Sequence, residues 1–175
     1  MKRLNIGCGN DIREGYVNLD KVPLEGVDVV WNVEKGLPFE DELFDEVLCK
    51  DILEHVDDYV LLLREIHRVL KVGGRAVIEV PHFTSENNFI DPTHKHMFSA
   101  FTFDFFVKGH PRSYYFDFHF SRIERRFIDF ERRLLNPINY LVQPIVNISD
   151  FTRLMYEKTL LRIFPARNII VVLVK

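Results

Sequence analysis

The stretch LNIGCGN at residues 4–10, followed by VNLD at residues 17–20, decides the fold. A short apolar strand pattern runs into Gly7-Cys8-Gly9, where a backbone with glycines can bend sharply and approach a ligand closely. A second strand pattern ends at Asp20. Because the carboxyl ends of parallel strands meet at one edge of an open α/β sheet, we expect the glycine turn and Asp20 to share a ligand crevice. A carboxylate there can accept hydrogen bonds from both hydroxyls of a ribose. The alternative is a simple tight turn followed by a loop.

Strand and helix patterns alternate in the first half of the chain, which favours a parallel sheet covered by helices. The predicted strands cover residues 3–6, 16–19, 27–31, 44–49 and 75–80. Between the last two, residues 57–71 repeat apolar side chains at helical spacing, and Gly73-Gly74 is expected to stop that helix.

The second half of the chain has a different composition, rich in aromatic residues and histidines. Its predicted elements are strands at residues 115–120, 122–134 and 168–174, a connection at 136–147, and an amphipathic helix at 149–164 with Phe151, Leu154, Met155 and Leu161 toward the core. We expect a single domain over residues 1–175, with 83–165 as a variable acceptor and lid segment.

Composition excludes several classes of protein. The 175 residues are 47% hydrophobic and 28% charged, with a net charge of −3, so the basic surface typical of a nucleic-acid binder is absent from the sequence. The apolar runs are too short to span a bilayer, and two cysteines are too few for a disulfide framework. The sequence therefore predicts a cytoplasmic protein that does not act on membranes or nucleic acids.

The spacing between the glycine turn and Asp20 distinguishes between nucleoside cofactors. A dinucleotide fingerprint needs a third glycine, an acid about 20 residues further on, and a helix that receives the pyrophosphate. Here Ile12 stands at the third glycine position, and Asp20 follows Gly9 too soon for a full helix. This disfavours a nicotinamide oxidoreductase.

Six segments in order carry a family resemblance: LNIGCGN (4–10), VNLD (17–20), LPF (37–39), FDEV (44–47), DILEHV (51–56) and LKVGG (70–74). Together they resemble class I S-adenosylmethionine-dependent methyltransferases of the small-molecule type 11 kind. The resemblance implies an α/β fold with a mostly parallel seven-stranded sheet, an antiparallel last strand, helices on both faces and, in this chain, a shortened first helix. It implies S-adenosyl-L-methionine as cofactor. We expect no metal site.

The resemblance also implies where the cofactor is held. Its methionine part would lie against Gly7, Cys8 and Gly9, and its ribose against Asp20, with Lys21 beside it.

The resemblance also implies that residues further along the chain contact the adenine and the sulfonium of the cofactor. Asn32 stands where the family usually has an aspartate for the adenine amino group, and Val33 would offer its backbone N–H. Lys50 and Asp51 would flank the sulfonium.

This sequence departs from the family pattern at three places. Asn5 and Asn10 replace an acid and a glycine of the first motif, Asn32 replaces the usual aspartate, and residues 10–15 leave no room for a full helix. A neutral amide makes a weaker hydrogen bond than a carboxylate. These departures leave open a non-catalytic module that binds S-adenosylmethionine.

Three histidines follow the fifth predicted strand and are candidate acceptor-binding or proton-accepting groups: His82, His94 and His96. Each could instead cap a turn or pack among aromatic rings. Asp91 with His94 and His96 also permits a metal site, but Pro92 interrupts the strand that would place both rings on one face. His55 resembles a family position near the cofactor, or it braces Glu54 and the helix start.

The aromatic residues of segment 98–120 have two interpretations. They are core residues that cover the sheet, or they line an acceptor pocket or a homodimer contact. Because a predicted strand begins at residue 3, we expect the cover of the active site to come from segment 83–165 or from a second subunit. The leading hypothesis is methyl transfer to oxygen or nitrogen of a small-molecule acceptor.

Overall fold

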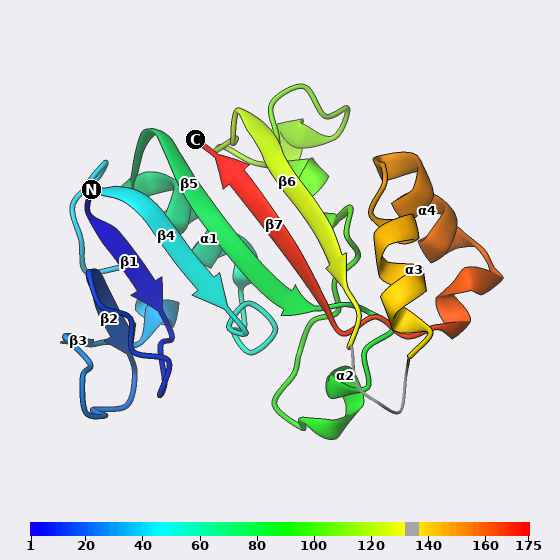
Figure 1. The fold of residues 1–175 in the computed structure, drawn as a ribbon. Coiled ribbons are helices and arrows are strands. Elements are labelled where there is room, and N and C mark those ends of the chain that lie inside the picture. The colour runs from blue at the N-terminus through cyan, green and yellow to red at the C-terminus, as the bar shows by residue number, and fades with distance from the viewer. Residues whose placement is uncertain (132–136) are drawn as a thin grey trace.

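The computed structural model describes residues 1–131 and 137–175 and centres on a seven-stranded sheet of order β3-β2-β1-β4-β5-β7-β6 (Figure 1). The strands are β1 (Arg3–Ile6), β2 (Tyr16–Asp20), β3 (Val29–Val30), β4 (Phe44–Lys50), β5 (Leu70–Pro81), β6 (Arg122–Asp129) and β7 (Asn168–Val174). The pairs β1–β2, β1–β4, β2–β3 and β4–β5 are parallel, whereas β7 is antiparallel to both β5 and β6. The expected mostly parallel sheet with an antiparallel last strand is confirmed.

Helices flank this sheet. They are α1 (Tyr59–Val69), α2 (Asn87–Ile90), α3 (Asn139–Val146) and α4 (Asp150–Lys158), with short 3-10 turns η1 (Val33–Lys35), η2 (Thr102–Phe106), η3 (Ser113–Tyr115) and η4 (Leu160–Ile163). In Figure 1, α1 runs behind the sheet, and α3 and α4 lie beyond β6. Within the described residues, every helix is too short or too polar to cross a membrane.

Helix α1 begins and ends where local chemistry dictates. The Asp58 side chain accepts a hydrogen bond from the backbone N–H of Leu61 at 2.9 Å and caps the first turn. The helix ends at Val69, before the expected stop, because Leu70 is already extended and pairs with Phe44 of β4. The expected role of Gly73-Gly74 as a helix stop is wrong. Gly74 lies inside β5, where a Cβ would approach the Lys71 carbonyl oxygen to 2.9 Å.

The connection between β1 and β2 has no helix, as the spacing implied. Two buried amides hold it instead. Asn5 Nδ2 donates to the Asp11 carbonyl at 2.8 Å and to Asn18 Oδ1 at 3.1 Å. Asn18 Oδ1 also accepts from the Arg13 backbone N–H at 3.0 Å, and its Nδ2 donates to the Arg13 carbonyl at 3.1 Å. These side chains replace the hydrogen bonds that a helix would have made internally.

The second half differs from the sequence expectation in several elements. Residues 115–120 form no strand, because their alternating rings insert into the core from a loop; Phe118 and Phe120 are buried. Residues 139–146 are helix α3, with Pro144 inside it, where a connection was expected. The end of the expected strand 122–134 and the start of the connection 136–147 lie outside the described residues.

The aromatic segment is mainly core. Its fully buried rings are Phe98, Phe103, Phe106 and Phe120. Tyr114 and Tyr115 remain exposed. The expected orientation of the 149–164 helix is wrong for three of its four residues, since Phe151, Met155 and Leu161 are exposed and only Leu154 is half-buried. Tyr156 and Glu157 face inward instead.

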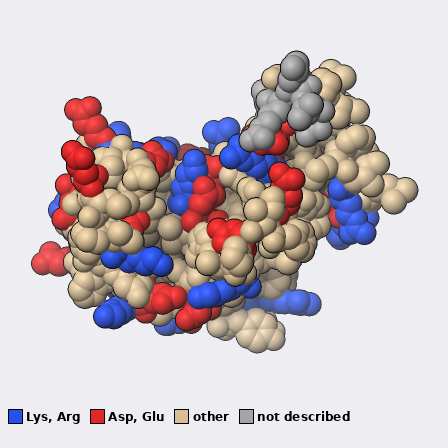
Figure 2. Space-filling model, turned by 90° about the horizontal axis from the view of Figure 1, so that it is seen from below, with Lys and Arg blue, Asp and Glu red and all other residues tan. Residues whose placement is uncertain are grey.

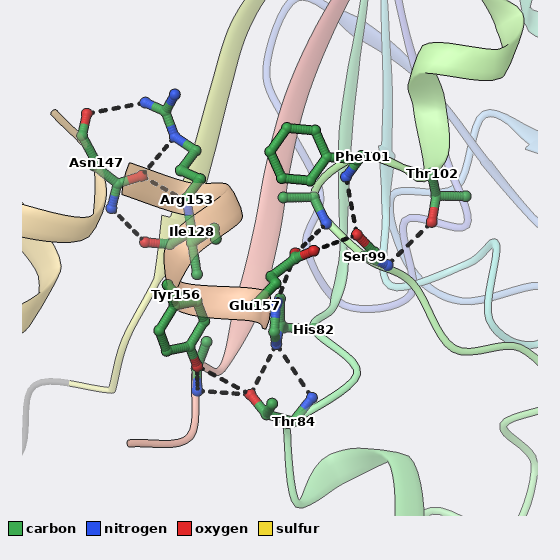
Figure 3. A network of polar contacts seen from close by, with 12 residues as sticks. His82, Thr84, Ser99, Phe101, Thr102, Ile128, Asn147, Arg153, Tyr156 and Glu157 are labelled. Carbon is green, nitrogen blue, oxygen red and sulfur yellow. Dashed lines mark hydrogen bonds and ion pairs between the residues drawn. The ribbon is translucent and has the colours of Figure 1, made fainter. Parts of the chain in front are cut away.

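A buried polar network joins α4 to the end of β5 (Figure 3). Glu157 Oε1 accepts from His82 Nε2 at 3.1 Å and from the Ala100 backbone N–H at 2.7 Å, and Oε2 accepts from Ser99 Oγ at 2.6 Å. Burial alone would raise the pKa of Glu157, but these three hydrogen bonds more than offset it, and the pKa lies below its usual range. The network ties the second half of the chain to the sheet.

Replacing Glu157 by glutamine should lower the free energy of unfolding by about 2 kcal/mol near neutral pH, because an amide cannot accept all three hydrogen bonds. Since the pKa of Glu157 is lowered in the folded state, its stabilisation is present above about pH 4.3 and is lost as the pH falls through the folded value. Denaturant titrations of both proteins at several pH values measure this difference.

The matched control is Glu124→Gln, which removes an exposed ion pair with Arg75 and should change stability little. Equal effects of the two substitutions would contradict the structural role given to Glu157.

Candidate cofactor and active site

A cavity of about 640 Å³ opens at the carboxyl ends of β1, β2 and β4. Its size falls in the range of sites that enclose a small cofactor. The residues expected at the cofactor that line it are Gly7, Asp20, Lys21, Asn32, Val33 and Asp51. Figure 2 shows the molecule from the side toward which the parallel strands point, and acidic and basic side chains are interspersed over the part of this face that is not grey.

The Asp20 carboxylate is fixed at the cavity wall. Its Oδ2 accepts from the Gly9 backbone N–H at 2.8 Å, and its Oδ1 accepts from the Val22 N–H at 2.9 Å. Each oxygen keeps a further lone pair for a ligand donor. A Cβ built on Gly9, which has φ +48°, would meet nothing within 4 Å among the described residues. The backbone of the glycine turn is therefore open beside Asp20.

Gly7 is required for close packing at the cavity floor. Its φ is +64°, and a Cβ would lie 1.9 Å from Ile52 Cδ1. Asp51, just before Ile52, also has a positive φ of 53°, which is a strained conformation for a residue other than glycine. Strain of this kind is found where a backbone must aim at a functional site.

The expected adenine region is formed by η1 and the residue before its cap. Asn32 Oδ1 accepts from the Glu34 backbone N–H at 3.0 Å and caps η1, so part of its hydrogen-bonding capacity is already used. Trp31 lines the cavity, and its Nε1 donates to the Gly36 carbonyl at 2.8 Å. This bond holds the indole ring in place.

Three residues expected at the cofactor do not line the cavity. Cys8 is 4% exposed, and burial raises the pKa of its thiol. Gly9 contributes its N–H to Asp20. Lys50 Nζ lies 3.9 Å from Glu79 Oε1.

The expected catalytic histidines differ in position. His82 is fully buried, its Nε2 is bonded to Glu157, and its Nδ1 accepts from the Thr84 N–H at 3.1 Å. The expectation that His82 faces an acceptor is therefore wrong. His96 does not line the cavity either, and its Nε2 lies 2.9 Å from the Val56 carbonyl oxygen.

His94 packs edge-to-face against His55, with ring centroids 4.6 Å apart, and His55 lines the cavity. Burial lowers the pKa of His55, which keeps its imidazole neutral near neutral pH. The adjacent Glu54 is 1% exposed, and burial raises the pKa of its carboxyl to about 8. The sequence pointed to His55 only through a family position.

Several lining residues were not predicted from the sequence. Trp31 and Val56 carry no chemical signature in the chain, and Pro92, Thr93 and Lys95 come from a loop more than 35 residues after Val56. Part of segment 83–165 thus lines the cavity, and its role in acceptor binding stays a prediction.

The sheet order and strand directions are those of the class I S-adenosylmethionine-dependent methyltransferase fold. Residues 4–78 match the family described as "Methyltransferase domain". A solved S-adenosylmethionine-dependent methyltransferase from Archaeoglobus fulgidus superposes with a TM-score of 0.64 at 23% identity, covering 99% of this chain and 86% of that one. The expected family resemblance and fold class are confirmed.

Among curated proteins, the demethylmenaquinone methyltransferase of Staphylococcus epidermidis is 39% identical over 72 residues, which are 39% of this chain and 30% of the relative. The chain thus spans about a third of that relative's length. The [4+2]-cyclase SpnF has the same fold, with a TM-score of 0.61 at 15% identity over 99% of this chain and 74% of its own. The fold therefore accommodates more than one chemistry.

Restoring the family's acid at position 5 should destabilise this chain. In Asn5→Asp, a carboxylate cannot donate to the Asp11 carbonyl and would be buried beside Asn18 Oδ1, so the free energy of unfolding should fall by about 2–4 kcal/mol. Denaturant titration measures this loss.

Asn10→Asp is the matched control, because Asn10 is exposed and the same substitution there should have little effect. A stable Asn5→Asp variant would contradict the role of the amide pair in holding the β1–β2 connection.

Proposed function

We propose that this protein is an S-adenosylmethionine-dependent methyltransferase that moves a methyl group to oxygen or nitrogen of a small-molecule acceptor. The observation that carries the proposal is the Asp20 carboxylate, which faces the cavity at the end of β2 while two backbone N–H groups fix its orientation. The matched methyltransferase family over residues 4–78 supports the same reading.

The residues present fit the cofactor. Asp20 has the free lone pairs to accept from both ribose hydroxyls. The open backbone at Gly9 leaves space for the amino-acid end, and Trp31 with Val33 offers an apolar wall for the adenine. A short loop in place of a helix N-terminus suits a cationic sulfonium better than an anionic pyrophosphate.

S-adenosylmethionine supplies a methyl group already activated on a sulfonium, so the protein's main task is to hold the acceptor atom about 3 to 3.5 Å from that carbon and to exclude water. The acceptor oxygen or nitrogen forms the new bond to the methyl carbon while the C–S bond breaks. Its electron pair stays on sulfur, giving S-adenosylhomocysteine, and the acceptor's proton is released. No nucleophile on the chain is needed.

The acceptor side of the cavity is the part of its wall formed by His55 and the loop with Pro92, Thr93 and Lys95. This assignment gives part of segment 83–165 the role of acceptor binding. His94 contacts His55 and is the expected histidine nearest this wall, whereas His82 and His96 are engaged elsewhere.

Replacing Asp20 by asparagine should weaken binding of S-adenosylhomocysteine at least about tenfold, because the loss of a charged acceptor for two hydroxyls costs more than about 1.4 kcal/mol. Isothermal titration calorimetry measures the affinity, and Glu25→Gln, an exposed neighbour outside the cavity, is the control that should bind as the wild type does. Unchanged affinity in Asp20→Asn, or binding of NAD in place of S-adenosylhomocysteine, would contradict the cofactor assignment.

Catalysis is tested separately with labelled methyl groups. A library of hydroxylated and amino acceptors, with demethylmenaquinone as one member, should yield a methylated product with at least one acceptor. Tight S-adenosylhomocysteine binding with no transfer to any member would favour the non-catalytic module instead.

A further inference from the structure

Three side chains beside the cavity come together in an arrangement that the methyl-transfer assignment does not use. Glu54, His55 and His94 each bring one potential ligand atom to a common point, and these atoms all lie within 4.8 Å of one another. His55 lines the cavity, so the cluster adjoins the space given to the acceptor.

Glu54 has no internal reason for its position. The residue is 1% exposed, and neither carboxylate oxygen has a hydrogen-bond partner among the described residues. A carboxyl group in such surroundings avoids the cost of an unpaired charge by staying protonated, or it ionises beside a cation or donor that compensates the charge. His55 and His94 each place a potential ligand atom within 4.8 Å of the Glu54 carboxyl group and could share such a cation.

Each histidine keeps one ring nitrogen available for an ion. His55 Nδ1 lies 2.9 Å from Thr93 Oγ1, and Thr93 Oγ1 in turn donates to Asp91 Oδ1 at 2.6 Å. The hydroxyl proton is thus engaged, so Nδ1 of His55 is the donor and Nε2 carries the free lone pair.

His94 lies beside the same aspartate, slightly beyond hydrogen-bond distance. Its Nε2 lies 3.8 Å from Asp91 Oδ2, and its Nδ1 is buried without a partner among the described residues. A carboxylate behind a histidine, directly or through a hydroxyl, is the usual outer support of a metal-binding imidazole.

The loop that carries His94 is held over Glu54 by contacts that need no metal. The Lys95 backbone N–H donates to the Glu54 carbonyl at 2.7 Å, His96 Nε2 lies 2.9 Å from the Val56 carbonyl, and Lys95 Nζ pairs with Asp57 at 2.6 Å. The cluster is therefore assembled in advance by the fold.

We propose that Glu54, His55 and His94 bind a divalent transition-metal ion of the Zn²⁺ type. One carboxylate and two imidazoles are a ligand set for such ions, and Mg²⁺, which prefers oxygen ligands, is disfavoured. In a tetrahedral zinc site two nitrogen or oxygen ligands lie about 3.4 Å apart, so side-chain rotations that bring the three ligand atoms closer by up to about 1.4 Å close the 4.8 Å spread. Three protein ligands leave a position open toward the cavity.

The open position would take a hydroxyl of the acceptor, a role that rests on the proposed function. Binding to the ion lowers the pKa of that hydroxyl, and its proton passes to solvent. The oxygen then attacks the methyl carbon, the C–S bond breaks with its electron pair on sulfur, and the products are the methyl ether and S-adenosylhomocysteine. The metal changes no oxidation state.

The binding test uses the full chain, freed of metal by a chelator and dialysis. Titration with ZnCl₂ in a calorimeter should show one ion per chain and a raised melting temperature, whereas MgCl₂ should produce neither effect. Co²⁺ should bind at the same place and give visible absorption bands.

Glu54→Gln and His94→Ala should weaken Zn²⁺ binding at least about tenfold. His110→Ala, outside the cluster, should not, and circular dichroism checks that each variant is folded.

Absence of stoichiometric Zn²⁺ binding would overturn the proposal, as would binding that persists unchanged in both cluster variants, which would indicate adventitious surface sites. The role of the metal ion in binding the acceptor hydroxyl is tested separately. If the ion has this role, a chelator should abolish methyl transfer to hydroxyl acceptors and added Zn²⁺ should restore it. Zn²⁺ binding with metal-independent transfer overturns that role. Zn²⁺ binding without transfer to any acceptor would count against the proposed function and leave the metal site standing.

Discussion

The hydrogen-bonded pair of buried amides, Asn5 and Asn18, is the constraint on which the site depends. It holds a connection of only nine residues between β1 and β2 without a helix, and so fixes where the glycine turn and Asp20 meet. The Gly9 N–H then reaches the Asp20 carboxylate at 2.8 Å. The replacement of an acid by Asn5, which looks like a weakened cofactor motif in the sequence, is explained by this loop, because only an amide can donate to the Asp11 carbonyl.

A second set of contacts holds the loop that forms part of the cavity wall. The loop with Thr93, His94 and Lys95 is bonded along its length to residues 54–57, which follow β4. Those bonds close one side of the cavity and place His94 over Glu54 and His55. The proposed cofactor side of the cavity is therefore built mainly from strand ends and the turn η1, and the proposed acceptor side from His55 and the loop held against it. The proposed metal site lies on that acceptor side.

The sequence was sufficient for features that depend on neighbours in the chain. The strand ends at Gly7 and Asp20 and the start of α1 follow from local patterns, and all were predicted at or within a residue or two of their places. The sequence was insufficient where the local structure depends on contacts between segments that are distant in the chain. Alternation at residues 115–120 is typical of a strand, but rings inserted from a loop produce the same pattern.

The histidines illustrate the same limit. The sequence alone does not distinguish the roles of His82, His94 and His96. Their roles differ because each contacts different residues that are distant in the chain. His82 is buried and hydrogen-bonded to Glu157, which is 75 residues away in the sequence. His94 lies beside Glu54 and His55, which belong to a different segment of the chain. No periodicity in the sequence encodes either meeting.

The most direct measurement is a crystal structure of the full chain with S-adenosylhomocysteine and ZnCl₂ present. The account predicts that the ribose hydroxyls lie within hydrogen-bond distance of the Asp20 carboxylate and that the sulfur faces the wall formed by His55 and Thr93. A nucleoside bound elsewhere, or a cavity that stays free of it at saturating concentration, would contradict the account.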